Sequence, residues 1–218
     1  MNIEWLGHSC FKLTESTGTT IVADPYDKSI VGFDMAATSA DVVTCSHQHK
    51  DHNAVVNVKG TPLVLSDCGF WEIKGVDISS MHSYHDDKSG KKRGENCIFK
   101  YRMDGVDLCH MGDIGEECTV RLAEGIGSVN VLMIPVGGNY TIDANQAKEY
   151  VDIIMPDIVI PMHFKTPNSE VDIDKLDEFL DLFDEEQIVK IDGRTLEVDR
   201  AYFEEDHTKV IVFNDEVF

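Results

Sequence analysis

Apolar positions along the chain recur in short runs bounded by turn residues, a pattern typical of β-strands rather than of long helices. Two turn signals, Ser16-Thr17-Gly18 and Asp104-Gly105, separate neighbouring runs and predict hairpins, so we expect the first half of the chain to be mostly antiparallel. We predict strands at residues 10–13, 19–23, 41–45, 62–65, 97–101, 106–109, 129–134, 157–161, 187–191 and 210–213.

Patterns of residues typical of helices occur in the second half of the chain. Asp143 and Gln146 are spaced as a capping box, which predicts a helix that begins there and ends near Ile153. Apolar side chains at helical spacing predict a second helix over residues 172–183. Because strands and helices mix along the chain without a low-complexity linker or a repeat of fixed period, we predict a layered α/β fold in which helices cover sheets.

The length and composition bound the domain organisation. The chain has 218 residues, 42% of them hydrophobic, which suffices for one sizeable core, so we expect a single domain over residues 1–218. The six cysteines show no CxxC spacing, which favours reduced thiols. The first residues, MNIEWLGHSCFKL, lack the features of a secretory signal, and no apolar stretch of about 20 residues occurs, so we expect a soluble, cytoplasmic protein. A homo-oligomer is left open.

The charge narrows the range of partners. With 40 acidic against 19 basic residues, the formal charge is −21, and such a surface repels nucleic acid and anionic membranes. One short segment runs against this trend and is either a solvated turn or a local trap for an anion. It contains Lys88, Lys91, Lys92 and Arg93.

Ionisable side chains follow several of the predicted strands. Asp24, His47, Asp113 and His163 each lie at or just after the end of an apolar run. A strand that runs into a His or Asp holds that side chain at the rim of a sheet, which suits an active site made of loops. Taken singly, each could instead be a turn former or a hydrogen-bonded rim residue.

The segment TCSHQHKDHN, residues 44–53, concentrates side chains that bind metals. His47 and His49 stand two positions apart, so in an extended segment they project from one face and can reach a common ion. Asp51 and His52 follow at an expected chain reversal and could hold a second ion. A polar turn that carries these residues by chance is the less favoured alternative.

The unbroken pattern His47-x-His49-x-Asp51-His52 resembles the hallmark motif of the metallo-β-lactamase-fold hydrolases. The phrases LGHSCFKL, HDDKSGKKRGEN, CHMGDIG, PVGGNYTID and PMHFKT are similar to the small single-domain branch that includes L-ascorbate 6-phosphate lactonase-like proteins. The resemblance implies a four-layer αββα sandwich, with two mixed β-sheets flanked by helices. The further family positions are matched, in chain order, by Asp24, His85, Asp113 and His163.

The resemblance also implies two adjacent sites for divalent metal ions. One is formed by His47, His49 and His85, the other by Asp51, His52 and His163, with Asp113 bridging them. Nitrogen and oxygen donors suit zinc first, and also manganese or iron. Two such ions lower the pKa of a shared water and supply a hydroxide that attacks the substrate, with Asp51 part of the catalytic group. Asp24 would accept a hydrogen bond from a ligand imidazole.

The roles of several of these residues have alternative interpretations. His82 and His85 compete for one ligand position, and we favour His85 because it directly precedes the polar glycine loop. His110 is either a catalytic neighbour of the cleft or buried with a partner. Arg93 and Lys165 are the cations best placed to bind an anionic substrate, and Tyr140 could donate to a developing oxyanion. Alternatively, Arg93 supports its own loop, Lys165 is a solvated side chain, and Tyr140 packs in the core.

These residues favour a metal-dependent hydrolase that cleaves a small anionic lactone or carboxylic ester. Hydrolysis of a small phosphodiester is the alternative, because the same hydroxide can attack phosphorus. Two hypotheses from other functional classes are an iron-dependent oxidoreductase and a non-catalytic metal-binding module.

Overall fold

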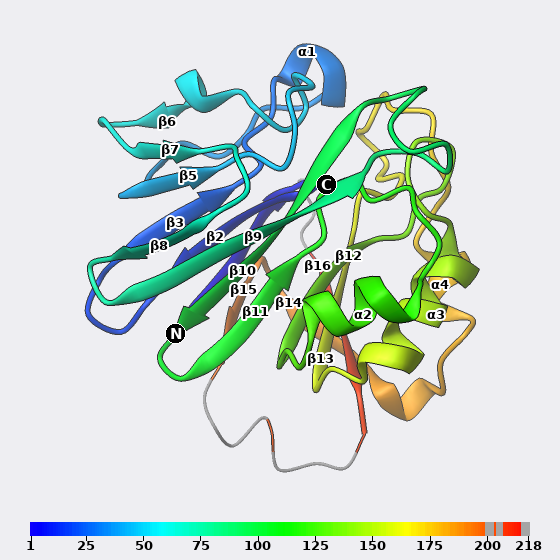
Figure 1. Ribbon diagram of the computed structural model, residues 1–218. Coiled ribbons are helices and arrows are strands. Elements are labelled where there is room, and N and C mark those ends of the chain that lie inside the picture. Colours follow the sequence, from blue (N-terminus) through cyan, green and yellow to red (C-terminus); the bar gives the residue numbers. More distant parts are fainter. Residues whose placement is uncertain (199–202, 204–206, 215–218) are drawn as a thin grey trace.

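Two mixed β-sheets lie face to face and bury an extended apolar core between them, as the computed structural model shows (Figure 1). The structure describes residues 1–198, 203 and 207–214. Helices and loops pack on the outer faces of the two sheets. This arrangement confirms the predicted α/β sandwich.

The first sheet carries the N-terminal hairpins. Strands β1 to β3 pair antiparallel, and β5 and β7 extend the sheet by parallel pairing, so the sheet is mixed. The turn signal at Ser16-Thr17-Gly18 joins β2 to β3 in the predicted hairpin. The order is β15 (Thr195–Glu197), β1 (Asn2–Gly7), β2 (Cys10–Thr14), β3 (Thr20–Ala23), β5 (Val42–Thr44) and β7 (Leu63–Leu65).

The second sheet has eight strands and is also mixed. The first five strands in its order are parallel, and the fifth strand and the three that follow it pair antiparallel, including the predicted hairpin at Asp104-Gly105. The order is β14 (Ile188–Asp192), β16 (Lys209–Asn214), β13 (Ile158–Met162), β12 (Val131–Pro135), β11 (Val106–His110), β10 (Glu95–Met103), β9 (Val76–Tyr84) and β8 (Phe70–Ile73).

Three helices cover the outer face of the eight-stranded sheet (Figure 1). They are α2 (Val120–Ile126), α3 (Ala144–Ile154) and α4 (Asp177–Leu180). The capping box of Asp143 and Gln146 is present at α3, as predicted. The helix predicted over residues 172–183 is wrong in length, because Asp174 pairs through its backbone with Gly137 and Lys165 instead of making helical bonds.

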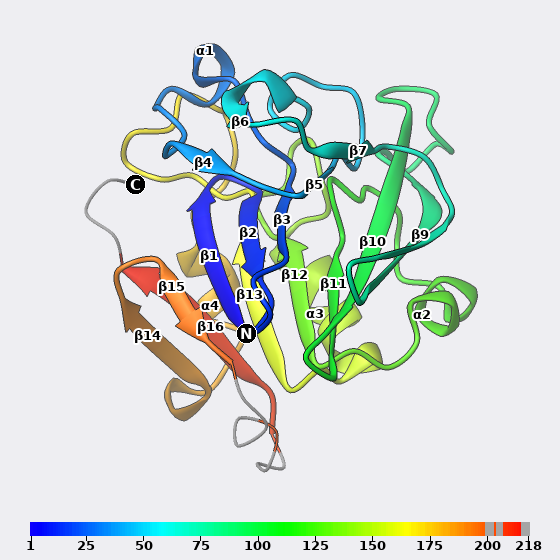
Figure 2. The ribbon, with the colours of Figure 1, turned by 90° about the vertical axis from the view of Figure 1, so that its left-hand side faces the viewer.

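The outer face of the six-stranded sheet is covered differently. A one-turn helix, α1 (Lys28–Val31), and the 3₁₀-helix η1 (Val55–Asn57) lie here with a small parallel pair, β4 (Thr38–Ser39) and β6 (Val58–Lys59) (Figure 2). Apolar side chains of this layer pack on the sheet. A second 3₁₀-helix, η2 (Glu185–Gln187), precedes β14. No helix among the described residues is long and apolar enough to span a membrane.

One polar contact crosses the core between the two sheets. Thr44 on β5 and Tyr101 on β10 are both buried, and their hydroxyl oxygens lie 2.6 Å apart. A buried hydroxyl that loses its partner destabilises a protein by about 1–3 kcal/mol, whereas removing both partners together is nearly neutral. This bond therefore fixes how the two sheets face each other at little net gain in stability.

We expect Tyr101→Phe to lower the free energy of unfolding by about 1–3 kcal/mol, since the Thr44 hydroxyl then stays buried without its partner. The double variant Tyr101→Phe/Thr44→Val should recover part of this loss. Urea unfolding at one fixed metal concentration measures both effects, because bound ligands shift apparent stability. Equal losses in the single and double variants would contradict the role of this pair.

Candidate metal centre

The loops that follow several strands meet at one rim of the two sheets. Asp24 follows β3, His47 follows β5, Asp113 follows β11 and His163 follows β13, and the structure brings all four into one buried cluster. The strand scaffold therefore delivers these side chains to a common place, as the sequence pattern predicts.

Two groups of ligand-type side chains form the cluster, and a third group, His47, His52 and Asp113, connects them. In the first, donor atoms of His47, His49 and His85 all lie within 4.8 Å of one another. The His47 ring centroid is 4.6 Å from that of His49 and 4.6 Å from that of His85. This is the first trio that the sequence analysis assigned to a metal.

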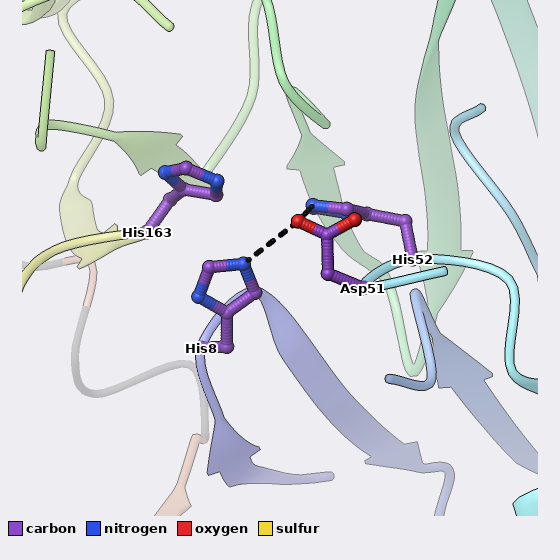
Figure 3. Close-up of side chains that lie close together, drawn as sticks. All are labelled: His8, Asp51, His52 and His163. Atoms are coloured by element: carbon purple, nitrogen blue, oxygen red, sulfur yellow. Dashed lines mark ion pairs between the residues drawn. The ribbon is translucent and has the colours of Figure 1, made fainter. Parts of the chain in front are cut away.

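The second group contains a residue that the sequence analysis missed. Donor atoms of His8, Asp51, His52 and His163 lie within 4.8 Å of one another (Figure 3). His8 comes from the turn between β1 and β2 in LGHSCFKL, a phrase used above only for family resemblance. A histidine beside a glycine in a tight turn of an apolar hairpin was the signal that could have identified it.

The Asp113 carboxylate lies between the two groups. Its Oδ2 is 3.2 Å from Nε2 of both His52 and His163, 3.4 Å from Nε2 of His85 and 3.9 Å from Nε2 of His47. One oxygen atom thus contacts imidazoles of both groups. This position suits a carboxylate shared between two cations.

Burial and charge set the protonation states of the cluster. Burial lowers the pKa of His47 to about 3 and that of His8 to about 4, with neighbouring imidazoles acting in the same direction. Burial opposes ionisation of Asp113, but the charges of His163 and His52 outweigh it and hold its pKa well below the usual range. Ionised carboxylates and neutral imidazoles are the forms that bind metal ions.

The charge balance at His52 also favours a cation. Burial lowers its pKa, but the carboxylates of Asp113 and Asp51 outweigh burial and raise the pKa well above the usual value. The carboxylates therefore stabilise positive charge at this imidazole. A bound metal ion can satisfy the same requirement as a proton.

Several nitrogen atoms of the cluster have no partner. Buried polar atoms are nearly always hydrogen-bonded, so a group of orphaned imidazole nitrogens around one carboxylate indicates a missing ligand. The residues present therefore fit a metal ion. Among the described residues, the unpartnered buried atoms of the cluster are Nε2 of His8, His47 and His52, Nδ1 of His85 and His163, and Oδ1 of Asp113.

Asp24 fixes the segment that carries the His47–His52 motif through three hydrogen bonds. Its carboxylate accepts hydrogen bonds from the backbone N–H of Ser46 at 2.7 Å, from the Ser46 hydroxyl at 2.5 Å, and from Nδ1 of His52 at 2.7 Å. The bond to Nδ1 leaves Nε2 of His52 facing Asp113 and the metal position. The structure therefore places Asp24 where the expected imidazole contact can form.

Two glycines allow the backbone to approach the cluster. Gly112 has φ +56, and a Cβ there would lie 2.3 Å from Oδ1 of Asn96, which accepts a hydrogen bond from the backbone N–H of Asp113. A Cβ on Gly137 would lie 2.1 Å from the backbone oxygen of His163. Larger residues at these positions would displace the two site residues they adjoin.

The other histidines lie outside the cluster. His82 is exposed, with Nε2 3.4 Å from Oε1 of Glu95. The structure brings His85 and not His82 to the site. His110 is buried, donates from Nε2 to the Ser9 backbone oxygen at 2.8 Å, and accepts at Nδ1 from the Gly112 N–H. Both of its nitrogens thus hold backbone beside the cluster, which matches the buried alternative.

A cavity of about 510 Å³ opens beside the cluster. Arg93 and Tyr140 line it, and the guanidinium carbon of Arg93 lies 5.4 Å from the centroid of the Tyr140 ring. Lys165 does not line this cavity; its Nζ donates to the Val171 backbone oxygen at 2.7 Å and so holds a loop that does. The remaining lining residues are Ile30, His49, Asp51, His85, Asp113, His163, Glu170, Val171 and Asp172.

The basic segment after His85 encloses a carboxylate of the protein itself. The buried carboxylate of Asp86 accepts from the backbone N–H groups of four residues of the loop. Burial raises its pKa, but these four donors outweigh burial and lower the pKa to about 2. Lys88 and Lys92 pair with Asp87. Of the basic side chains in this segment, Arg93 is the one that lines the cavity beside the cluster.

Comparisons with known proteins agree with this geometry. The family of β-lactamase superfamily domains matches residues 2–163. A UPF0173 metal-dependent hydrolase from Methanoregula boonei is 30% identical over 190 residues, covering 76% of this chain and 83% of that protein. A relative of the same description from Carboxydothermus hydrogenoformans is 28% identical over 197 residues, covering 76% and 85%.

A solved structure extends the likeness over almost the full chain. It is a metallo-β-lactamase-superfamily protein from Thermotoga maritima, thought to be a Zn-dependent hydrolase. Its sequence is 36% identical, the superposition covers 97% of each chain, and the TM-score is 0.81.

We expect His49→Ala and Asp51→Ala each to reduce the number of metal ions retained, because each removes a donor from a different group. Elemental analysis of the purified variants after dialysis measures this number. His82→Ala is the matched control, since its imidazole lies outside the cluster. Full metal retention in both site variants would show that the ligand assignment is wrong.

Proposed function

The chain belongs to the metallo-β-lactamase superfamily, and from this we propose that it is a metal-dependent hydrolase that cleaves a small anionic lactone or carboxylic ester. The observation that carries the proposal is the Asp113 carboxylate, whose Oδ2 lies within 3.9 Å of an imidazole nitrogen on four different histidines. A carboxylate shared by two ligand groups supports two divalent ions.

The donor set supports zinc first. All of its atoms are imidazole nitrogens or carboxylate oxygens, which also suit manganese and iron. The Thermotoga maritima structure thought to be a Zn-dependent hydrolase supports the same preference. When bound, two such ions lower the pKa of a water and supply hydroxide near neutral pH without a serine or cysteine nucleophile.

The residues of the chain would position both reacting partners. Asp51, Asp113 and the histidines would hold the ions on one wall of the cavity, and Asp24 orients the His52 ring through its hydrogen bond with Nδ1. Tyr140 lines the same cavity and is half-exposed, so its phenol could donate to an oxyanion that develops on the substrate.

Arg93 is the residue best placed to bind an anionic group. Its Nη2 donates to the Asn139 backbone oxygen at 2.8 Å, which uses one of the five N–H donors of a guanidinium. The contact with the Tyr140 ring holds the guanidinium at the cavity wall. A carboxylate or phosphate group on the substrate could accept from its remaining donors in the bidentate geometry that Arg favours.

The alternative functions would use the same site for a different reaction or for none. A phosphodiester could occupy the same cavity, because the shared-ion arrangement also serves attack on phosphorus. An iron-dependent oxidoreductase would use the same nitrogen and oxygen donors. A non-catalytic module would keep the metal and lack turnover, so activity assays separate all three from the leading proposal.

We expect the metal-loaded protein to hydrolyse an anionic sugar lactone, and expect chelation to abolish this activity and Zn²⁺ or Mn²⁺ to restore it. A bis-aryl phosphate assayed in parallel tests the phosphodiesterase. Turnover of the phosphate alone would refute the lactonase, and oxygen uptake with reduced iron would favour the oxidoreductase. Full metal occupancy without turnover on any ester, lactone or phosphodiester would favour the non-catalytic module.

We expect Arg93→Ala to raise KM for an anionic lactone by about 10- to 100-fold, as expected for a lost charge-assisted hydrogen bond. The KM for a neutral lactone of similar size should change little. Arg121→Ala is the matched control, because this exposed arginine lies at another cavity. A loss of the same size on both lactones would show that Arg93 supports the loop and does not bind the anion.

A further inference from the structure

His8 lies at the turn between β1 and β2, and its imidazole points into the metal cluster (Figure 3). The side chain is 3% exposed, and Nε2 has no hydrogen-bond partner among the described residues. Leaving a buried polar atom unpaired is unfavourable, so this nitrogen is expected to have a ligand that protein atoms do not provide.

The nearest groups to this nitrogen are candidate metal ligands. Nε2 lies 3.7 Å from Oδ2 of Asp51, too far for a hydrogen bond. The His8 ring centroid is 4.3 Å from that of His163 and 5.4 Å from that of His52. Figure 3 shows the Asp51 carboxylate between the rings of His8 and His52.

These separations are compatible with one shared ion. Nitrogen and oxygen ligands bind zinc at about 2 Å, so two ligands of one ion lie roughly 3–4 Å apart. The donor atoms of His8, Asp51, His52 and His163 all lie within 4.8 Å of one another. Small rotations of the side chains would therefore bring all four around a single centre.

The backbone around His8 is held in place by several contacts. His8 has φ 53, in the left-handed region that non-glycine residues rarely adopt. Its backbone oxygen accepts from the Trp5 indole at 3.0 Å and from the His163 N–H at 3.4 Å. The next residue, Ser9, accepts from His110. These contacts fix the turn directly against the loop that carries His163.

We propose that His8 is a fourth protein ligand of the metal ion held by Asp51, His52 and His163. This inference deepens the proposed function and rests on it only for the presence of a metal ion. It makes the two positions unequal. With Asp113 shared, one position has five protein donors, and the other has four, His47, His49, His85 and Asp113.

The inequality assigns different roles to the two positions. A divalent ion with five protein donors would be held more tightly, and would have less coordination left for other molecules, than an ion with four. The position with three histidines has fewer protein donors, so it would be the one that accepts substrate. The His8 position should therefore fill first when metal is added to the metal-free protein.

We expect His8→Gly to weaken the tighter of two Zn²⁺-binding steps by at least about tenfold and to leave the weaker step nearly unchanged. Titration of the chelator-stripped protein with Zn²⁺ against a chromophoric competitor measures both steps. Glycine is chosen because it tolerates φ 53 without a side chain. Added imidazole should restore part of the lost affinity by occupying the space vacated by the ring.

Three further variants complete the test. His82→Ala should bind like the wild type, and His49→Ala should weaken the other step. His8→Asn, whose side chain also tolerates the left-handed region, replaces His8→Gly if circular dichroism shows that the glycine variant is unfolded. The d–d absorption spectrum of the Co²⁺-loaded protein should change at one of its two positions in either His8 variant.

Two results would separate this inference from the proposed function. If a His8 variant binds both ions within about threefold of the wild type, His8 is not a ligand, whatever the enzyme hydrolyses. If the wild type binds one ion with an affinity that depends on His8, the His8 assignment holds and the paired metal site is wrong.

Discussion

The buried carboxylate of Asp113 is surrounded by imidazoles that reach it from separate parts of the chain. An ionised carboxylate removed from water is strongly unfavourable unless opposite charge or hydrogen-bond donors surround it. His47 and His52 arrive from the loop after β5, His85 from the end of β9 and His163 from the end of β13. The need to compensate this one charge therefore links both sheets at their common rim, and a bound cation would satisfy it more completely than the imidazoles alone.

Holding these groups together requires unfavourable backbone conformations. His8, Asp24 and His163 all have φ near +50, and each directly follows the last residue of a strand. In this conformation the chain reverses sharply, so the side chain turns into the space between the loops instead of continuing the alternation of the strand. The extensive hydrogen bonding and apolar packing of the sheets behind the loops stabilise these residues in place. The rigidity of the sandwich is thus part of the site.

Much of this arrangement could be predicted from the sequence, because apolar strands and the hexad 47–52 carry strong local signals. The strands β8 and β9 were missed because β9 alternates with serine, histidine and aspartate, so its apolar pattern is weak. The extended helix at residues 172–183 was predicted from spacing alone, although tertiary backbone bonds to Asp174 override it. His8 was missed for a similar reason. One histidine in a turn has no local pattern, and only the fold brings it to His163, which is 155 positions later in the numbering.

The charges that line the cavity bear on the proposed binding of an anionic substrate. The chain carries a formal charge of −21, and the cavity itself is lined by Asp51, Asp113, Glu170 and Asp172 with Arg93 as its arginine. Without cations, this cavity repels an anion, and one guanidinium cannot compensate four carboxylates. In the proposed function, divalent ions at the cluster would reverse the balance on one wall, so an anionic group would be attracted between the ions and Arg93. Binding of an anionic substrate and loading of the metal would then both depend on the same charge distribution.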